Sequence, residues 1–443
     1  MRPSKGGRKG RRAPRGWGPS HQRINWPAVV CWLLAVLAVT LFITSAPSET
    51  PTLSSHEGPM RVEHWRNGST VIVGSVSAPV TVQYDEVRAA TGRPDGEAVD
   101  VFMSSDQRDL RPIVVVMNST LVHTRYPERL FFHLILPPAY ADYASKVLSL
   151  IFPNTAFGIN ENAADIHAIK RRLVRINGTY VQQGLTSLYA YFPYYLPHIA
   201  PGLERIIYLD TDVVVKADIT ELADMAMHGF PLAAVEDCSQ TFGLVLDFRM
   251  LAHIKKDAVP GEPGRESRYD KGACSVNRGV MAVNANFWLI KNITGHIEWW
   301  MEHSGRGKAA LYRYGQAQPP FLLAANKKYM KLPLEWNVRG LARDEFIGKE
   351  KEGLAKLGYD KDYFDKIGVH GKKPFVSPFA DTARVLHFNG RHKPWIRGRD
   401  REPGEQPPAL CGQQLVDCAQ LWWQYLSPKA EEILLDLERR LTL

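Results

Sequence analysis

A short apolar run that ends in two aspartates constrains this sequence more than any other feature. Residues 205–209 (RIIYL) predict a buried strand, because the four residues after Arg205 are apolar, aromatic or β-branched without helical spacing. Asp210 and Asp212 follow directly, with Thr211 between them, and the apolar run then resumes. Ligands of open α/β sheets bind beyond the carboxyl ends of strands, and two carboxylates there suit a hard cation that holds a diphosphate. The segment therefore predicts a metal site at a strand end.

The same triplet occurs a second time in a different context. Asp360 and Asp362 flank Lys361 in the polar run YDKDYFDK, with no strand before them. Composition alone predicts about one Asp-x-Asp triplet in a chain of this length, so the spacing by itself decides nothing. We interpret the second pair as part of a solvated surface.

The N-terminal segment predicts a membrane anchor. Residues 27–46 carry no charge, and a helix of that length spans a hydrocarbon core of about 30 Å. Residues 1–26 are basic without an acidic residue, which predicts a cytosolic tail and a luminal remainder. A cleaved signal peptide is the alternative, but the apolar core is long and no clear cleavage site follows. We expect a single-pass type II protein of the Golgi apparatus membrane or the endoplasmic reticulum.

The net charge of +9 does not indicate a nucleic-acid-binding protein. The basic tail accounts for nearly all of it, and the rest of the chain is close to neutral. A basic binding face therefore lacks support, and no nucleic-acid partner is expected.

Sequons and cysteines agree with a luminal body. Glycosylation sequons begin at Asn67, Asn118, Asn177 and Asn292. One cysteine lies in the predicted anchor and four follow it, an even number that suits an oxidising compartment. Four cysteines allow three pairings, and chain proximity favours Cys238 with Cys274 and Cys411 with Cys418. A zinc site is the alternative, although no close Cys-x-x-Cys pair is present.

The order of strand and helix signals predicts an α/β domain. Residues 47–97 are rich in Pro, Ser, Thr and Gly, which is typical of a stem. A strand at 99–103, a helix at 111–122 and a strand at 130–136 then form a β-α-β unit with parallel strands. We assign residues 98–400 to this domain.

Three further segments complete the expected organisation. Residues 231–238 predict another strand with acids at its end. Residues 242–271 are rich in charge, Gly and Pro, and we expect a loop over the site. Residues 401–443 form a C-terminal extension with an amphipathic helix at about 428–441.

The run LHFNGRHKPW complements the aspartate pair. His387 can supply a nitrogen ligand, Gly390 lets the backbone approach a phosphate, and Lys393 can neutralise a diphosphate oxygen. A histidine alone is more often an ordinary hydrogen-bonding residue. Together with Asp210 and Asp212, however, His387 predicts a metal site that stabilises a departing nucleoside diphosphate.

These motifs together resemble the family-eight retaining glycosyltransferases, such as glycogenin and the plant galacturonosyltransferase-like proteins. LDTDVVV, CSVNRGVMAVNANFW and HFNGRHKPW occur in the order seen in that family. The sequence is particularly similar to the animal glycosyltransferase 8 domain-containing proteins, through VEDC, NITGHIEWWM, PPFLLA and WNVRGLA as well. The resemblance covers roughly residues 99–397. It implies a GT-A fold, with one mixed Rossmann-like sheet flanked by helices, and transfer of a hexose from a UDP-sugar with retention, usually with manganese.

The resemblance also implies roles for individual residues. Asp210, Asp212 and His387 match the metal ligands, and Gly390 and Lys393 match diphosphate contacts, with Thr211 inside the same nucleotide-binding motif.

Other positions match the nucleoside and sugar contacts. Ser104 and Asp106 lie in the loop after the first strand, where the family holds the uracil. Asn277 and Gly279 match an Asn-x-Gly turn near the donor sugar, and Glu236 matches an acidic position near the donor and acceptor hydroxyls. The alternatives stay open, because Glu236 also fits a solvated strand end and Asn277 an ordinary turn.

The likeness departs from the family pattern at two places. Relatives carry an arginine in the helix before the aspartate strand, whereas this chain reads LYAYFPYYLP, with Pro193 near that position. The Asp-Gln pair that relatives hold beside the anomeric carbon has no clear match, and Gln318 is the candidate for it. Without a placed carboxylate nucleophile, the expected mechanism is front-face attack by the acceptor, with the departing diphosphate as base.

The expected function is metal-dependent transfer of a hexose from a UDP-sugar to a glycan or glycoprotein acceptor. One alternative is a luminal protein that keeps the fold to bind sugar or nucleotide without turnover. The three intact candidate ligands argue against it. A hydrolase with paired catalytic carboxylates is a third hypothesis, but it leaves Lys393 without a role.

Overall fold

The computed structural model describes residues 98–441 except 161–162, 183–186, 305–309, 314–316, 347–349, 357, 360, 367, 369–370 and 399–406. The predicted tail, anchor and stem, residues 1–97, lie outside the described residues. Within the described part of the chain, no helix combines the length and apolar character needed to cross a bilayer.

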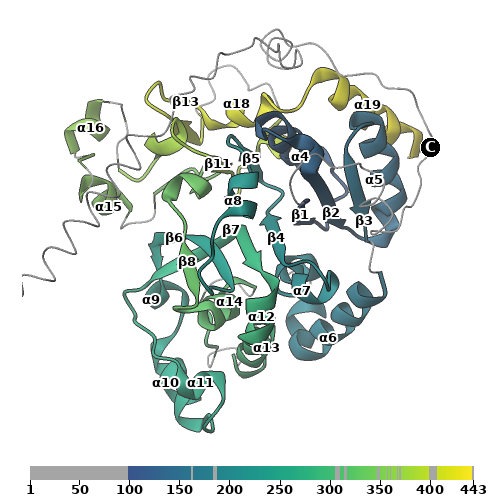
Figure 1. The fold of residues 1–443 in the computed structure, drawn as a ribbon. Helices are drawn as coiled ribbons and strands as arrows, with labels where there is room; N and C mark the ends of the chain where they lie inside the picture. Colours follow the sequence, from purple (N-terminus) through teal and green to yellow (C-terminus); the bar gives the residue numbers. More distant parts are fainter. Residues whose placement is uncertain are drawn as a thin grey trace, which may run out of the picture. The chain divides into compact units, whose positions relative to one another are not determined.

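Among the described residues, seven strands form a central sheet in the order β3-β2-β1-β4-β7-β6-β8 (Figure 1). They are β1 (Val99–Ser104), β2 (Leu130–Ile135), β3 (Ala156–Ile159), β4 (Arg205–Leu209), β6 (Leu232–Thr241), β7 (Cys274–Asn284) and β8 (Tyr329–Lys331). β1 pairs in parallel with β2 and β4, and β2 with β3, as the β-α-β order predicts. β7 is antiparallel to β4 and β6, so the sheet is mixed, as expected.

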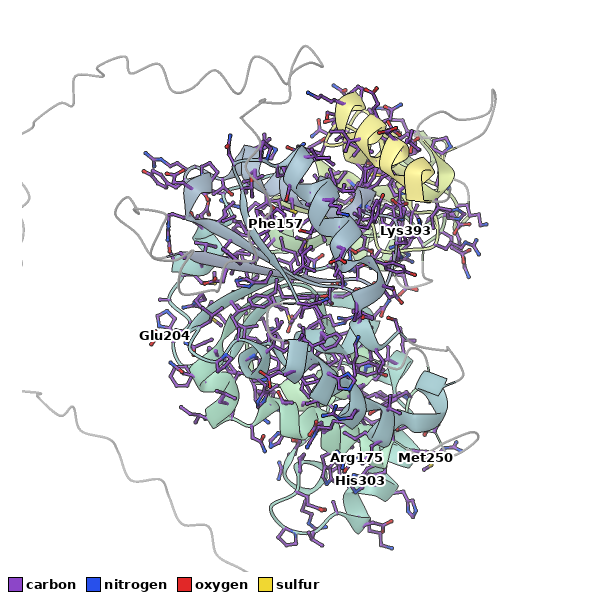
Figure 2. The ribbon with its side chains drawn as sticks, turned by 90° about the vertical axis from the view of Figure 1, so that its right-hand side faces the viewer. Phe157, Arg175, Glu204, Met250, His303 and Lys393 are labelled. Atoms are coloured by element: carbon purple, nitrogen blue, oxygen red, sulfur yellow. A yellow bond between two sulfur atoms is a disulfide. The ribbon has the colours of Figure 1, made fainter. Side chains whose placement is uncertain are left out.

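Alternate residues of the strands enter two hydrophobic cores, one on each face of the sheet. In β1, Val101 and Met103 join the first core and Phe102 joins the second; in β4, Leu209 joins the first and Tyr208 the second. Successive side chains of a strand point to opposite faces, which explains the alternation. Side chains consequently fill the layers on both sides of the sheet (Figure 2).

Helices cover both faces of the sheet. The first core includes residues of α4 (Arg111–His123), α5 (Pro138–Ile151) and α19 (Pro428–Leu441). The second includes residues of α6 (Ala163–Gln182), α13 (Ile293–His303) and α14 (Gln318–Ala325). The predicted helix at 111–122 and the C-terminal amphipathic helix are both confirmed, and α19 packs against α5.

The prediction of a loop at 242–271 was wrong. This segment, which is fully described, contains α9 (Phe242–Val245), α10 (Phe248–Asp257) and α11 (Pro263–Glu266). Asp247 begins α10, because its carboxylate accepts hydrogen bonds from the backbone N–H groups of Arg249 and Met250. Leu251 is the buried residue on the apolar side of α10. Charge-rich composition obscured this cap and the helical spacing behind it.

Among the described residues, two smaller sheets and two disulfides lie mostly in the C-terminal half of the chain. One sheet has the order β5-β11-β9, and the other β10-β12-β13. Their strands are β5 (Val213–Val215), β9 (Val338–Arg339), β10 (Phe375–Ser377), β11 (Val385–His387), β12 (Ala409–Cys411) and β13 (Val416–Asp417). Both predicted disulfides are confirmed: Cys238–Cys274 joins β6 to β7, and Cys411–Cys418 joins β12 to α18 (Cys418–Trp423).

Two surface predictions can be compared with the structure. Asp362 is exposed on α16 (Lys361–Lys366), as expected for a solvated pair, while Asp360 lies outside the described residues. Of the sequon asparagines, Asn292 is exposed, whereas the Asn118 side chain donates to the carbonyl oxygen of Tyr425 at 2.8 Å. Asn118 is therefore engaged within the fold.

Candidate metal and donor site

Asp210 and Asp212 lie in the turn between β4 and β5, with Thr211 between them. The apolar residues on both sides of the turn are buried, so the backbone of the two carboxylates is fixed by the core. The Tyr208 hydroxyl donates to Asp210 Oδ1 at 2.8 Å. Burial and the neighbouring Asp210 carboxylate raise the pKa of Tyr208, so its phenol stays protonated and keeps donating.

His387 reaches the aspartates because β11 pairs with β5. His387 lies opposite Val213 in this pair, and the backbone N–H of Phe388 donates to the carbonyl oxygen of Asp212 at 2.8 Å. The buried imidazole places Nε2 3.0 Å from Asp212 Oδ1 and 3.9 Å from Asp210 Oδ2. One ligand atom of each residue lies within 4.8 Å of the other two. The structure thus brings together the three residues predicted to hold a metal.

A chain of amides sets the tautomer of His387. The Asn277 Oδ1 accepts from the backbone N–H of Gly279 at 2.9 Å and from Asn337 Nδ2 at 3.1 Å. Because Asn337 donates with Nδ2, its Oδ1 is left to accept from His387 Nδ1, at 2.9 Å. The proton of neutral His387 is therefore on Nδ1, and the lone pair of Nε2 faces the aspartates.

Asn337 is a site residue that sequence reasoning missed. It is fully buried within the run WNVRGLA, which marks the family resemblance but carries no charged ligand of its own. Its burial is visible only in the folded chain, so no local sequence pattern marks it as a site residue. Asn277, by contrast, was predicted to contact the donor sugar, and its Oδ1 is already engaged by two donors.

Gly279 leaves the space that the candidate ligands occupy. A Cβ atom at this position would lie 2.9 Å from Asp210 Oδ2 and would overlap the imidazole of His387. The backbone N–H of Asp210 also donates to the Gly279 carbonyl oxygen at 2.8 Å. Glycine is therefore required here by close packing of the carboxylate and the imidazole, and two carboxylates with one free imidazole nitrogen fit a divalent cation.

Lys393 is paired with one of the aspartates. Its Nζ donates to Asp212 Oδ2 at 2.5 Å and to the Phe388 carbonyl oxygen at 2.8 Å. Burial would raise the pKa of Asp212, but its interactions with His387 and Lys393 hold it well below its usual value. Asp212 is thus kept ionised, and Lys393 is within reach of whatever binds this carboxylate.

The backbone conformation and packing at Gly390 also require a glycine, apart from its predicted approach to a phosphate. Its φ of 140° lies in a region that favours glycine, and a Cβ atom there would clash with the Ala342 backbone. The glycine therefore lets the 388–393 loop pack directly on the turn after β9.

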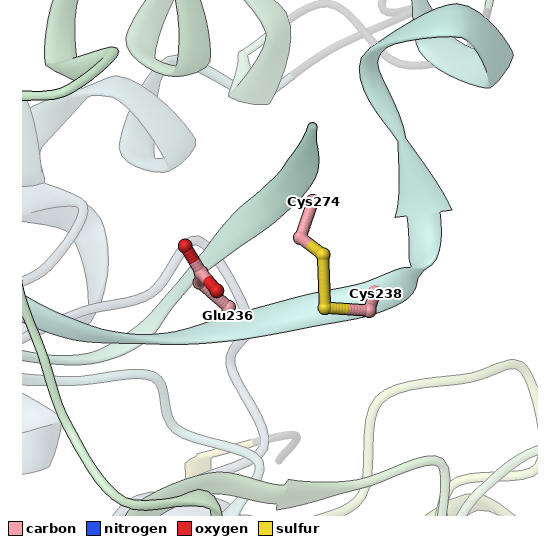
Figure 3. Close-up of side chains that lie close together, drawn as sticks. All are labelled: Glu236, Cys238 and Cys274. Carbon is pink, nitrogen blue, oxygen red and sulfur yellow. A yellow bond between two sulfur atoms is a disulfide. The ribbon is translucent and has the colours of Figure 1, made fainter. Parts of the chain in front are cut away.

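Glu236 lies beside the Cys238–Cys274 disulfide on β6 (Figure 3). Its Oε1 accepts from the Tyr329 hydroxyl and lies 2.9 Å from Lys331 Nζ, so β8 holds the carboxylate in place. Glu236 and the two sulfurs are close enough to form a metal-binding group, but the disulfide consumes both thiols. Glu236 is therefore an ion-paired carboxylate in the middle of β6, opposite Val276 of β7.

The other predicted residues lie around the same sheet edge. Gln318, at the start of α14, donates from Nε2 to the Val276 carbonyl oxygen at 3.1 Å, one residue before Asn277. The Ser104 hydroxyl donates to the Tyr189 carbonyl oxygen at 2.9 Å and lies 3.3 Å from the Tyr208 hydroxyl. Asp106 is exposed in the loop after β1.

The segment in which relatives carry an arginine forms a short helix in this chain. Residues Leu188–Tyr194 form a 3-10 helix, η2, in which Pro193 and its aromatic neighbours are buried. Sequence reasoning missed a second basic residue near the site. Arg278, between Asn277 and Gly279 on β7, places Nη1 3.9 Å from Asp210 Oδ1. Its position inside the predicted Asn-x-Gly turn was the sequence signal that could have identified it.

Comparison with known proteins identifies relatives over much of the chain. The chain is 27% identical over 313 residues to probable galacturonosyltransferase-like 10 of Arabidopsis thaliana, covering 70% of this chain and 74% of that protein. It is 30% identical over 223 residues to glycosyltransferase 8 domain-containing protein 1 of Danio rerio, covering 46% and 51% respectively.

A solved structure and a family model also match the chain. The galactosyltransferase LgtC, solved with donor and acceptor sugar analogues, is 17% identical with a TM-score of 0.41, covering 74% of this chain and 95% of that one. At that TM-score the structural likeness supports no further inference. The model of glycosyl transferase family 8 matches residues 100–398, about two thirds of the chain. The chain therefore belongs to glycosyl transferase family 8.

Proposed function

We propose that this protein transfers a hexose from a UDP-sugar to a glycan or glycoprotein acceptor, with a divalent cation such as Mn²⁺ and with retention at the anomeric carbon. The single observation that carries the proposal is the group formed by Asp210, Asp212 and the Nε2 atom of His387 at the end of β4. The mixed sheet with helices on both faces fits the GT-A-like fold of the family, whose donors bind at such a strand end.

Asp210, Asp212 and His387 would hold the cation, and a bound cation would neutralise charge on the departing UDP. Lys393 is the second source of positive charge. If Lys393 exchanges its contact with Asp212 for a contact with a diphosphate oxygen, its ammonium group stays paired with a negative charge throughout. Both groups stabilise negative charge where it develops, so they lower the barrier to leaving-group departure.

The remaining candidates surround the donor sugar and the acceptor. Gln318 and Asn277 lie beside the same turn of β7, and Glu236 lies across from it on β6. None of these is a carboxylate held free for nucleophilic attack, since Glu236 is engaged by Tyr329 and Lys331. This supports front-face attack by the acceptor hydroxyl, with a diphosphate oxygen receiving its proton. Ser104 and Asp106 are proposed to border the uracil.

We further propose that the protein is a type II membrane protein of the Golgi apparatus or the endoplasmic reticulum, with residues 47–443 in the lumen. The uncharged residues 27–46 and the basic tail before them support this orientation. The two disulfides support an oxidising compartment.

The test is UDP release by the purified full-length protein with Mn²⁺ across a panel of UDP-hexoses and UDP-hexuronates. The panel includes hexuronates because the Arabidopsis relative is named as a galacturonosyltransferase-like protein. Asp212→Asn removes one candidate ligand charge, while Asp362→Asn makes the same change in the exposed second triplet.

Release of UDP from one donor, lost in Asp212→Asn and kept in Asp362→Asn, is the expected result. Mn²⁺-dependent binding of UDP without release from any donor, even with candidate acceptors added, would favour a sugar- or nucleotide-binding protein that retains the family fold.

A further inference from the structure

The middle residue of the Asn277–Gly279 turn is an arginine with one buried nitrogen, Nη1, that no hydrogen bond among the described residues satisfies. The side chain of Arg278 is 15% exposed. Its contact with Asp210 Oδ1, at 3.9 Å, is too long for a hydrogen bond. Burying a guanidinium N–H without an acceptor is costly, so a ligand that brings an acceptor would be favoured here.

An aromatic side chain holds this arginine in place. The guanidinium carbon of Arg278 lies 5.6 Å from the ring centroid of Tyr194, which is a cation–π contact. Tyr194 is fully buried, donates to the Ala317 carbonyl oxygen at 2.8 Å and stacks on Phe321. The arginine is therefore positioned before any ligand binds, which reduces the entropy lost on binding.

The position of Tyr194 connects Arg278 with the departure from the family pattern. Tyr194 follows Pro193 directly, inside the run LYAYFPYYLP, which contains no lysine or arginine. The guanidinium of Arg278 thus lies against the segment in which relatives carry their arginine. A positive charge is present at this segment after all, although it comes from β7.

Asp210 links this charge to the candidate metal ligands. Its Oδ2 faces His387 Nε2, and its Oδ1 faces the Tyr208 hydroxyl and Arg278 Nη1. Asp210 thus lies between the imidazole of His387 and the guanidinium of Arg278.

We propose that Arg278 is a donor-binding residue that supplies the positive charge missing from residues 188–197. This inference rests on the proposed function, because its ligand is the nucleotide sugar. A guanidinium fork suits an anionic oxygen near the anomeric carbon, either on the sugar-bearing phosphate or on the C6 carboxylate of a hexuronate. The shared chemistry is an anionic oxygen of the donor, either on its phosphate or on its sugar.

The test is calorimetric titration of the full-length protein with UDP, UDP-glucose and UDP-glucuronate in the presence of Mn²⁺. Arg278→Met removes the charge, and Arg278→Lys keeps the charge without the fork. Arg205→Met is the matched control. Arg205 lies at the opposite end of the paired strands β4 and β7, is also partly buried, and also has an Nη1 without a hydrogen-bond partner among the described residues.

Arg278→Met is expected to weaken binding about 10- to 100-fold, the loss of one charge-assisted hydrogen bond, with an intermediate loss in Arg278→Lys and none in Arg205→Met. A loss shared by all three nucleotides assigns the phosphate as the ligand, and a loss confined to UDP-glucuronate assigns the carboxylate. Thermal melting of each variant identifies misfolding, and Arg278→Lys carries the test if Arg278→Met unfolds.

Two other results would overturn the inference. Unchanged binding of all three nucleotides by a folded Arg278→Met protein would refute the role of Arg278 and leave the proposed function standing. Failure of the unaltered protein to bind any of the three with Mn²⁺ would refute both.

Discussion

The Nδ1 atom of His387 lies 2.9 Å from Oδ1 of Asn337, and this contact determines which ring nitrogen faces the aspartates. Its direction is not arbitrary, since the backbone N–H of Gly279 fixes Asn277 as an acceptor and Asn277 in turn fixes Asn337. A backbone group thus orients a candidate metal ligand through two buried amides. Loss of such outer contacts typically costs about 10- to 100-fold in metal affinity.

Replacing Asn337 with leucine should weaken Mn²⁺ binding about 10- to 100-fold, because His387 loses the acceptor that keeps its Nε2 unprotonated. Asn337→Asp keeps an acceptor for His387 and loses only the donor to Asn277, so it should weaken binding less. Calorimetric titration with Mn²⁺ measures both. Asn326→Leu is the control, because its amide donates to the Arg268 carbonyl oxygen away from the site. Equal affinity in Asn337→Leu and the unaltered protein would contradict the tautomer argument.

Gly279→Ala should weaken Mn²⁺ binding at least several-fold. The added methyl group would overlap His387 and approach Asp210, so at least one candidate ligand must move. Overpacking of this kind typically costs about 1–3 kcal/mol, which corresponds to a fall in affinity of at least several-fold. Equilibrium binding of Mn²⁺ at fixed pH is the measurement.

Gly272→Ala is the matched control for this change. The nearest atom to a Cβ at Gly272 is an Asp270 carboxylate oxygen at 3.5 Å, an ordinary contact. Loss of Mn²⁺ binding in both alanine variants would point to a general sensitivity of the β6–β7 region instead of a steric requirement at Gly279.

Breaking the two disulfides should have unequal effects on stability. The chain-entropy model gives about 4 kcal/mol for a closed loop of the Cys238–Cys274 length, with a sequence separation of 36, and about 2.5 kcal/mol for Cys411–Cys418, with a separation of 7. The double alanine variant of each pair, compared by urea unfolding, measures the difference. An equal or reversed order would show that native-state contacts outweigh loop entropy here.

The sequence predicted the strand that carries the aspartates because its signal is local. An uninterrupted apolar run followed by Asp210 and Asp212 needs no distant partner to be recognised. The disulfides were accessible for the same reason, since each pair is close along the chain. The helices over 242–271 were missed because a single cap, Asp247, starts the longest of them in a charge-rich segment.

The rest of the site depends on pairings that no local pattern contains. His387 was identified through its motif, but its contact with Asp212 follows from the pairing of β11 with β5, across more than 170 residues. Asn337 and Arg278 act through neighbours that only the folded chain supplies. Their residue types are common in turns and on surfaces, so spacing alone could not distinguish them.

His296 should make the stability of the protein fall as the pH is lowered from about 6.5 towards 4. Its Nδ1 accepts from Lys328 Nζ at 2.7 Å, and burial together with this positive charge lowers the pKa of His296 to about 4. The unfolded chain, with an ordinary histidine pKa of about 6.5, binds the proton more tightly than the folded chain does. The stabilising effect of neutral His296 is therefore complete above about pH 6.5 and decreases below it.

Urea unfolding at pH 7 and pH 5 should give a smaller loss of stability in His296→Gln than in the unaltered protein. His303→Gln, a change at an exposed histidine of the same helix, should keep the full loss, and an unaltered pH dependence in His296→Gln would exclude His296 as its source.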